Sequence, residues 1–368
     1  MDTLKTIPIA SPQIGDEERR AVLAVLESGQ LAQGPVVEAF ENEFAAWCGV
    51  DHAVAVNSGT AALHLLLLAH GIKEGDEVIT SPFTFVASAN AALFVGARPA
   101  FADIELETCC LDPSRVEAAI TPRTRAIMPV DLYGQVAALD ELRDIADRHG
   151  LLLLEDACQA HGAEMRGRKA GALGFDATFS FYPTKNITTA EGGMVTTADA
   201  AIAGKVRVLR QHGAGTRYVH EVLGYNFRMT DIAAAIGRAQ LTKLDRFNEA
   251  RRRNAAILSK GLAGVPGIVL PRERPGCRHV YHQYTIRVES DRDALQRRLR
   301  ELGIGTAVHY PIPVHLQPFY EELGYGHQSM PSAELAARQV LSLPVHPGLS
   351  EADLQRIIDS VRQAASQA

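Results

Sequence analysis

The sequence predicts an α/β protein built around a mainly parallel sheet that helices cover. Residues 16–28 and 139–150 carry aliphatic side chains at three-to-four spacing with charges on the other face, as amphipathic helices do. Residues 76–81, 125–132 and 150–158 are short and nearly continuously apolar, which is typical of strands buried on both faces. Helices and buried strands that alternate along a chain imply a parallel sheet between layers of helices.

Beyond about residue 230 the pattern changes, and a second, smaller α/β unit is expected. Residues 229–262 predict one long helix or two, and the proline- and glycine-rich residues 264–276 interrupt it. The run Arg251-Arg252-Arg253 fits a solvated helix face better than an anion site. The elements expected after the break are a strand over 281–289, a helix over 291–302 and a helix over 350–366.

Length and composition describe an ordinary globular chain. Its 368 residues exceed what one simple core usually holds, so we expect a large domain over residues 1–245 and a small C-terminal domain over residues 246–368. The net charge of −6, with acidic and basic residues mixed along the chain, offers no basic field to a nucleic acid or an anionic membrane. We therefore expect neither as a partner.

A cytoplasmic location is expected from what the sequence lacks. The leucine runs at 65–69 and 151–154 are far shorter than the ~20 apolar residues that cross a bilayer. The first ten residues lack the basic start and apolar core of a targeting segment. Five cysteines without a C-x-x-C pair fit neither a disulfide framework nor a zinc site, so no metal is expected.

Candidate catalytic groups follow the strand expected at 150–158. Active sites of open parallel sheets lie outside the carboxyl ends of the strands. This segment delivers Glu155, Asp156, Gln159 and His161 to that edge. Asp156 could also do no more than cap a following helix, and spacing alone favours that simpler interpretation. A catalytic role for Asp156 would require a partner group beside it.

A candidate anion site lies where the apolar residues 54–56 meet Asn57-Ser58-Gly59-Thr60 and a long aliphatic helix. Ser58 can cap that helix, and the free N–H groups of its first turn can bind an anion. Gly59 lets another backbone approach closely. A phosphate would fit on Gly59 and Thr60, although an ordinary capped helix explains this segment equally well.

Lys185 lies in the segment "SFYPTKNITT", among hydroxyl, amide and aromatic side chains and just before a glycine pair. It could be the exposed end of a strand, or its amine could be a covalent catalyst. A lysine, the carboxylate of Asp156 and the helix-terminal site at Gly59 together are what pyridoxal 5′-phosphate requires. The lysine forms the Schiff base, the carboxylate meets the pyridine nitrogen, and the helix binds the phosphate. The sequence therefore predicts this cofactor.

The sequence resembles the DegT/DnrJ/EryC1/StrS aminotransferases, the sugar aminotransferase family. The resemblance implies a pyridoxal-phosphate-dependent transferase of the aspartate aminotransferase type, known as fold type I. It extends from near the N-terminus to the segment "LSLPVHPGLS". The motifs that carry it, in the family's order and at roughly its spacing, are residues 81–104, 151–163, 179–197, 223–241 and 308–318.

The resemblance assigns roles around the cofactor ring. The lysine that matches Lys185 forms the Schiff base, and the aspartate that matches Asp156 pairs with the pyridine nitrogen and makes the ring a better electron sink. Phe85 matches the aromatic residue that stacks on the ring, although alone it could be a core residue beside Phe83. Gln159 matches a residue near the ring hydroxyl.

The resemblance also assigns roles at the phosphate. Ser180 joins Gly59 and Thr60 in the phosphate site. Asn226 matches an asparagine that reaches the phosphate of a neighbouring subunit, and Arg228 fixes that loop or meets substrate. The implied functional unit is a homodimer with shared active sites.

The proline-stiffened loop at 308–318 carries His309, Tyr310 and His315, which in this family lie near the substrate entrance. His315 is the better candidate for substrate contact. For His309, a role in simply closing the small domain is an equal alternative.

The function implied is transfer of an amino group from L-glutamate or glutamine to a keto sugar, here a nucleotide-linked 3- or 4-keto-deoxysugar. A cyclitol aminotransferase that acts on a keto-inositol would use the same residues and stays an alternative. Retention of Lys185 argues against the sugar dehydratases of the family, which carry histidine there. A regulatory protein without turnover is disfavoured because every catalytic position is filled.

Overall fold

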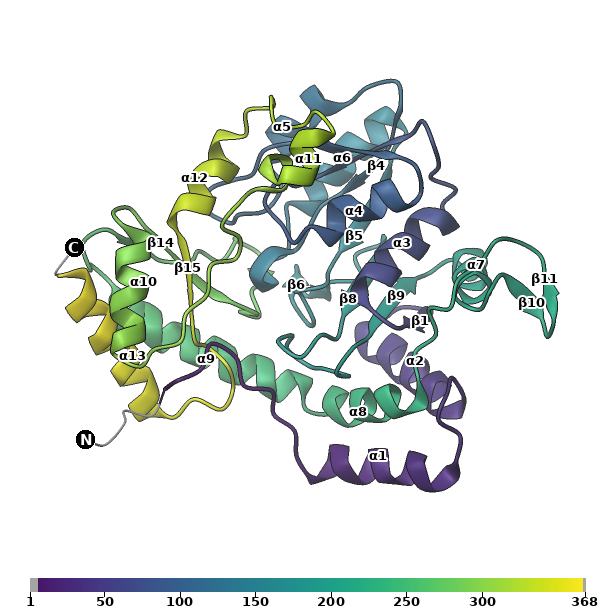
Figure 1. Cartoon of the computed structure of the whole chain (residues 1–368), viewed down its shortest axis with the longest axis horizontal. Coiled ribbons are helices and arrows are strands. Elements are labelled where there is room, and N and C mark those ends of the chain that lie inside the picture. Colours follow the sequence, from purple (N-terminus) through teal and green to yellow (C-terminus); the bar gives the residue numbers. More distant parts are fainter. Residues whose placement is uncertain (1–5, 367–368) are drawn as a thin grey trace.

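The computed structural model describes residues 6–366, and a seven-stranded sheet forms its centre (Figure 1). The strand order is β1-β9-β8-β5-β4-β2-β3. The neighbours from β8 to β3 pair in parallel, and β9 alone runs antiparallel to both of its neighbours. The predicted mainly parallel α/β sheet is confirmed. The strands are β1 (His52–Val56), β2 (Glu77–Thr80), β3 (Arg98–Phe101), β4 (Thr124–Met128), β5 (Leu152–Asp156), β8 (Asp176–Ser180) and β9 (Gly193–Thr197).

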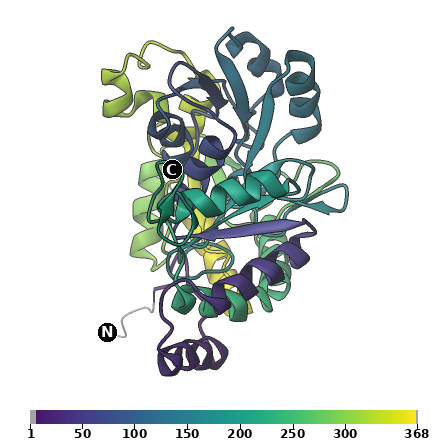
Figure 2. The ribbon, with the colours of Figure 1, turned by 90° about the vertical axis from the view of Figure 1, so that its right-hand side faces the viewer.

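Helices cover both faces of this sheet. Successive side chains along a strand point to opposite faces, so each apolar strand packs against helices on both sides. Along β1, Val54 and Val56 pack with helices α3 and α7, whereas Ala53 and Ala55 pack in the core that α2 lines. Figure 2 shows α2 and α7 on opposite sides of β1. The helices of this part are α2 (Pro35–Cys48), α3 (Gly59–Ala69), α4 (Ala87–Phe94), α5 (Pro113–Ala119), α6 (Leu139–His149) and α7 (Ala200–Arg210).

A second, antiparallel sheet of three strands has its own apolar core. Its order is β12-β14-β15, and Ile7 from the N-terminal segment packs into that core. The division of the chain at residue 245 stays a prediction. The elements of this part are α9 (Leu244–Leu262), β12 (Ile268–Val269), β14 (Tyr284–Val288), α10 (Arg292–Glu301), α12 (Pro331–Gln339), β15 (Val340–Leu343) and α13 (Glu351–Ala365).

The other elements are short or lie at the edges of the molecule. Helix α1 packs along α8 at one end, and the hairpin of β10 and β11 projects from the body (Figure 1). No helix among residues 6–366 is long and apolar enough to span a membrane. These elements are α1 (Asp16–Ser28), η1 (Leu132–Gly134), β6 (Glu164–Met165), β7 (Arg168–Lys169), β10 (Ala214–Thr216), β11 (Val219–His220), α8 (Asp231–Leu241), β13 (Cys277–Arg278), η2 (Val314–Leu316) and α11 (Pro318–Glu322).

The structure refines one expectation from the sequence and corrects another. The long helical segment is two helices, α8 and α9, which separate at Thr242 and Lys243. The expectation of a solvated arginine face on α9 is wrong for Arg251, which is 6% exposed and donates to the backbone carbonyls of Tyr281 and His282. Arg252 forms an ion pair with Glu273 of the same chain and is not part of a site for a bound anion.

Candidate active site

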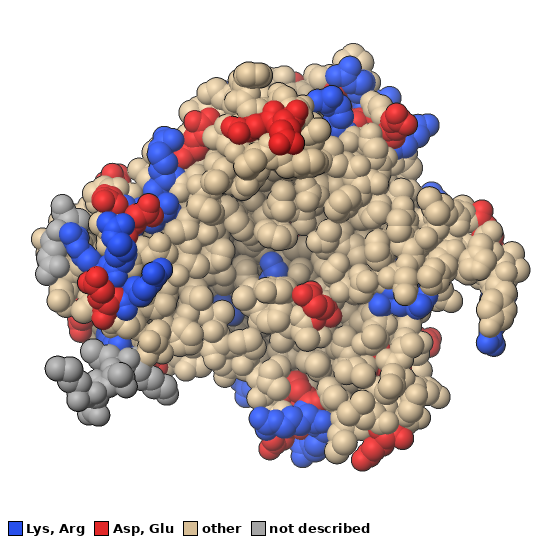
Figure 3. Space-filling model, viewed as in Figure 1, with Lys and Arg blue, Asp and Glu red and all other residues tan. Residues whose placement is uncertain are grey.

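A cavity of about 520 Å³ opens at the carboxyl ends of β5 and β8. Figure 3 shows this face of the molecule hollowed near its middle, with basic side-chain atoms at the bottom of the hollow. Most of the residues predicted from the sequence meet there. Those that line the cavity are Gly59, Thr60, Phe85, Asp156, Gln159, Ser180, Lys185, His309 and Tyr310.

The N-terminus of α3 forms one wall of this cavity. Ser58 Oγ accepts a hydrogen bond from Ala61 N at 3.1 Å, and Ser58 O accepts the first intrahelical bond, from Ala62 N. The N–H groups of Gly59 and Thr60 precede these bonds and are free for an anion. A Cβ atom on Gly59 would lie 2.7 Å from Ser180 Cβ, so only glycine allows the end of β8 to approach this closely. The result is an anion site made of the N–H groups of Gly59 and Thr60 and the hydroxyl of Ser180.

Asp156 ends β5 with its carboxylate buried and oriented from two sides. Its exposed fraction is 3%. Ser88 Oγ on α4 donates to Oδ2 at 2.7 Å, and Cys158 N donates to Oδ1 at 3.2 Å. The residues after Asp156 form turns, so it does not cap a helix. Ser88 was not predicted from the sequence, although it lies within the motif at 81–104.

Lys185 follows β8 in a turn, and its backbone N–H donates to Tyr182 O at 2.9 Å. Its side chain is partly buried and lines the cavity. Burial lowers the pKa of the amine below its ordinary value, while Cys158 and Asp156 oppose this shift. A lowered pKa increases the fraction of unprotonated amine, which is the nucleophilic form.

Behind Asp156 lies a pair of fully buried carboxyl groups, Asp131 and Glu155. Burial raises the pKa of both groups, and the charge of Glu155 raises that of Asp131 further. One oxygen of each carboxyl group accepts a hydrogen bond from a backbone N–H group. Asp131 Oδ1 accepts from Ala137 N and Glu155 Oε2 accepts from Gly171 N, both at 2.9 Å. Burial and the neighbouring carboxyl group thus favour the protonated form in this pair. Neither residue lines the cavity.

Aromatic and amide side chains form the opposite wall. Phe85 is 55% exposed with its ring centroid 6.1 Å from that of Tyr310, whereas Phe83 is fully buried. Phe85 is therefore not a core residue. Gln159 accepts from Tyr133 N at 2.9 Å and donates to Tyr310 Oη at 3.2 Å. Tyr133 Oη in turn donates to the backbone carbonyl of His309.

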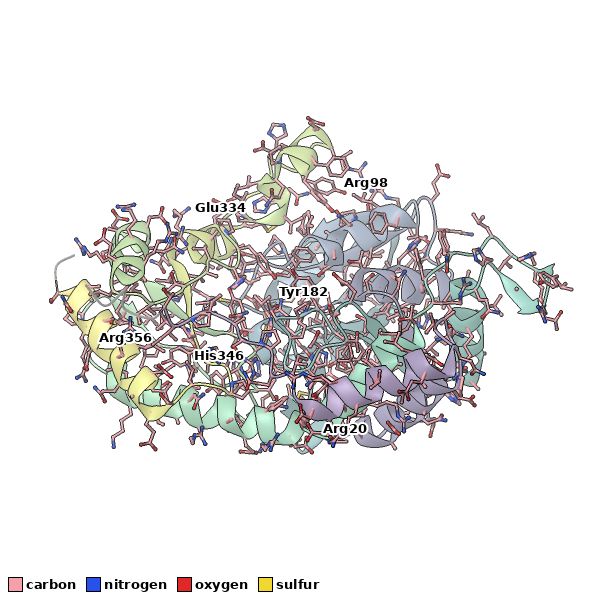
Figure 4. The ribbon with its side chains drawn as sticks, turned by 60° about the horizontal axis from the view of Figure 1, so that its bottom comes forward. Arg20, Arg98, Tyr182, Glu334, His346 and Arg356 are labelled. Carbon is pink, nitrogen blue, oxygen red and sulfur yellow. The ribbon has the colours of Figure 1, made fainter. Side chains whose placement is uncertain are left out.

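His315, Asn226 and Arg228 lie outside the cavity. His315 is fully buried, with Nε2 3.6 Å from Glu334 Oε1, so the structure does not bring it to the substrate position predicted for it. Figure 4 shows Glu334 well apart from Tyr182, which lines the cavity. Asn226 and Arg228 follow the projecting hairpin, and their predicted roles toward a partner subunit stay predictions.

Several cavity residues were missed from the sequence. His282 and Gln283 come from the segment before β14, where no motif marked them, and Glu191 precedes β9. The described residues contain no cluster of histidine, cysteine and carboxylate side chains that could hold a metal ion. The missed residues of the cavity include Thr84, Ser88, Tyr182, Thr184, Glu191, His282 and Gln283.

The chemistry of these groups fits pyridoxal 5′-phosphate. The anion site on α3 suits a phosphate, the carboxylate of Asp156 suits a protonated ring nitrogen, and the amine of Lys185 suits an aldehyde. Phe85 offers an accessible aromatic face.

Comparisons with known proteins identify the family of this chain. A family model described as the DegT/DnrJ/EryC1/StrS aminotransferase family matches residues 12–362. The chain is 47% identical over 357 residues, 97% of its length and 94% of the relative's, to dTDP-3-amino-3,4,6-trideoxy-alpha-D-glucose transaminase of Streptomyces venezuelae. It is 42% identical over 371 residues, 99% of both chains, to GDP-perosamine synthase of Caulobacter vibrioides.

Solved structures extend this likeness. The structure of S. venezuelae DesV in complex with a ketimine intermediate matches with a TM-score of 0.96 and 46% identity, over 99% of this chain and 100% of that one. A putative sugar aminotransferase of Streptococcus pneumoniae, Spr1654, is 29% identical and matches both in its PMP form, with a TM-score of 0.95 over 98% of both chains, and in its PLP form, with a TM-score of 0.94 over 98% of this chain and 99% of that one. The chain is therefore a pyridoxal-phosphate-dependent transaminase. It belongs to the DegT/DnrJ/EryC1/StrS aminotransferase family.

Proposed function

We propose that this transaminase moves an amino group from L-glutamate or glutamine to a nucleotide-linked 3- or 4-keto-deoxysugar. The observation that carries the proposal is the meeting of Lys185, Asp156 and the anion site of α3 in one cavity. Its volume, about 520 Å³, lies within the range of small-molecule sites. The names of the two relatives, which act on dTDP- and GDP-linked sugars, support the substrate class.

The cofactor supplies an aldehyde that links to amino groups and a ring that accepts electrons. The residues of the chain supply the rest of the chemistry. Lys185 Nζ would hold the aldehyde of the cofactor and, when it is unlinked, would carry the proton that leaves the donor's α-carbon. Ser88 and the backbone of Cys158 hold the Asp156 carboxylate in one orientation, so it would offer a fixed negative charge to the ring nitrogen of a bound cofactor.

The charge of the cavity supports a site shared between two copies of the chain. Among the described residues that line it, Lys185 is the single lysine or arginine. A nucleoside diphosphate and an amino acid carboxylate both need cationic partners. The homodimer in this proposal brings Asn226 and Arg228 of one copy to the cavity of the other. Tyr218 in the projecting hairpin and Leu223 just after it are each at least 80% exposed and offer an apolar surface for that contact.

Dilution tests the shared site. Specific activity should fall as the enzyme dissociates, because each cavity loses the groups of its partner, and it should return when the protein is concentrated again. Activity and sedimentation are measured on the same dilution series. A fully active monomer contradicts this part of the proposal.

A cytoplasmic location also belongs to the proposal and agrees with five cysteines that are all unpaired.

A half-reaction screen tests the substrate. The enzyme is first converted to its amine form with L-glutamate or L-glutamine, which also identifies the donor, and is freed of both. Candidate keto compounds are then added singly, and return of the aldehyde-form absorbance identifies the acceptor. We expect a nucleotide-linked keto-deoxysugar to react and the free sugar to react far more slowly. If scyllo-inosose reacts and no nucleotide-linked keto sugar does, the cyclitol alternative replaces the proposal.

A further inference from the structure

The hydroxyl of Ser342, in the three-stranded sheet, contacts a histidine that lines the cavity. Ser342 Oγ lies 3.0 Å from His309 Nδ1 and 2.9 Å from Thr285 Oγ1. Thr285 and Ser342 are paired across β14 and β15, so their side chains lie on the same face of that sheet. Ser342 is fully buried. Its hydroxyl is therefore held between these two partners.

The backbone at His309 is held by both parts of the structure. Ser342 N donates to Ala307 O at 2.8 Å, and Ala307 N donates to Ser342 O at 3.2 Å. From the other side, Tyr133 Oη in the η1 turn donates to the carbonyl of His309. The imidazole can still rotate about its side-chain bonds, and the hydrogen bond between Nδ1 and Ser342 is the contact that limits this rotation.

This arrangement leaves the second ring nitrogen of His309, Nε2, for the cavity. His309 lines the cavity, and Nε2 forms no hydrogen bond with residues 6–366. Nε2 is also not one of the unpartnered polar atoms that the protein encloses. By contrast, the unpartnered ring nitrogens of His161, His315 and His346 are enclosed, and none of these three residues lines the cavity. A ligand in the cavity can therefore reach Nε2 of His309.

The charge of the imidazole indicates which part of the ligand this is. Burial and the charge of Lys185 lower the pKa of His309 to about 4, so the ring is neutral near neutral pH. Carboxylates and phosphates prefer cationic partners. A hydroxyl group can both donate and accept, so it fits Nε2 in either tautomer of the neutral ring. A keto sugar carries such hydroxyl groups, whereas L-glutamate and L-glutamine carry none.

We propose that Ser342 is a positioning residue of the active site, which holds the imidazole of His309 so that Nε2 hydrogen-bonds to a hydroxyl of the keto sugar. The proposal rests on the proposed function, because it takes the acceptor to be a sugar. Ser342 does not itself line the cavity, so it acts on the reaction through His309. Both residues are thereby assigned to the acceptor half-reaction.

A double-mutant cycle in the holoenzyme tests this inference. Ser342→Ala, His309→Phe and the double variant are converted to the amine form and mixed with the keto sugar found in the screen. We expect the acceptor half-reaction to slow about 3- to 10-fold in Ser342→Ala and about 10- to 100-fold in His309→Phe. In the His309→Phe background, Ser342→Ala should change the rate less than about twofold, because the nitrogen through which it acts is gone. The half-reaction with L-glutamate should change less than about threefold in all three variants.

Ser360→Ala serves as the matched control, because it removes the hydroxyl of another buried serine, on α13, that does not line the cavity. It should react at the wild-type rate in both half-reactions. An acceptor rate equal to that of the wild type in Ser342→Ala or in His309→Phe overturns the inference. So does an effect of Ser342→Ala that is the same with and without His309, or equal slowing of both half-reactions. If the wild type reacts with L-glutamate but with no keto sugar, the proposed function fails, and this inference with it.

Discussion

Lys185→Ala is expected to reduce transamination by more than about 10⁴-fold, because one change removes both the covalent link to the cofactor and the proton carrier. The variant should still fold, since the side chain is only partly buried and forms no ion pair within residues 6–366. Steady-state rates with L-glutamate measure the loss. The absorbance band of the covalently linked cofactor should disappear even where the cofactor still binds.

Two controls separate chemistry from structure in this experiment. Lys260→Ala, at an exposed position of α9, should keep the wild-type rate and spectrum. Small primary amines added to Lys185→Ala should restore a fraction of the rate, because they can carry the proton in place of Nζ. Retention of more than a few per cent of the activity by Lys185→Ala would exclude the covalent role assigned to this lysine.

The fold was largely predictable because its strands are buried on both faces. Continuous apolar runs at 76–81 and 150–158 became β2 and β5, and helices cover both sides of the sheet. The position of Asp156 followed from where such a strand ends, whereas Lys185 stood out by its polar and aromatic neighbours in the sequence. The sequence could not show that Ser88 would reach Asp156, since that contact joins residues 68 positions apart.

The choice between His309 and His315 shows where sequence reasoning reaches its limit. Both lie in one proline-stiffened loop, and spacing does not tell which side chain faces the cavity. Tertiary packing decides it. His315 packs against Phe101, with ring centroids 6.3 Å apart, while His309 lines the cavity and its backbone accepts from Tyr133.

Arg251 could have been identified from the sequence. It follows Phe247 by four residues and precedes Leu258 by seven, a spacing that places all three on one face of a helix. Phe247 and Leu258 are buried, as is Arg251. Burial lowers the pKa of its guanidinium to about 10, a value at which it is still charged near neutral pH. The arginine run thus contains one residue that supports the backbone of the cavity wall.

Asp156→Asn is expected to slow both half-reactions by about 10²- to 10⁴-fold while leaving the fold intact. A neutral amide cannot balance a protonated ring nitrogen, so the bound cofactor becomes a weaker acceptor of electrons. The local contacts survive the change. The amide oxygen can accept from Cys158 N, and the Ser88 hydroxyl can rotate to accept from the new amide group.

The neighbouring residue provides the control for this prediction. Glu155→Gln removes a carboxylate one position earlier on the same strand, but that side chain lies outside the cavity and its amide can still accept from Gly171 N. Rates close to wild type are expected in Glu155→Gln, because this side chain does not line the cavity and burial already favours its uncharged form. Thermal unfolding should show both variants folded. If the two variants lose activity equally, the loss comes from the disturbed end of β5 rather than from the charge on Asp156, and the ring-nitrogen role would have to be withdrawn.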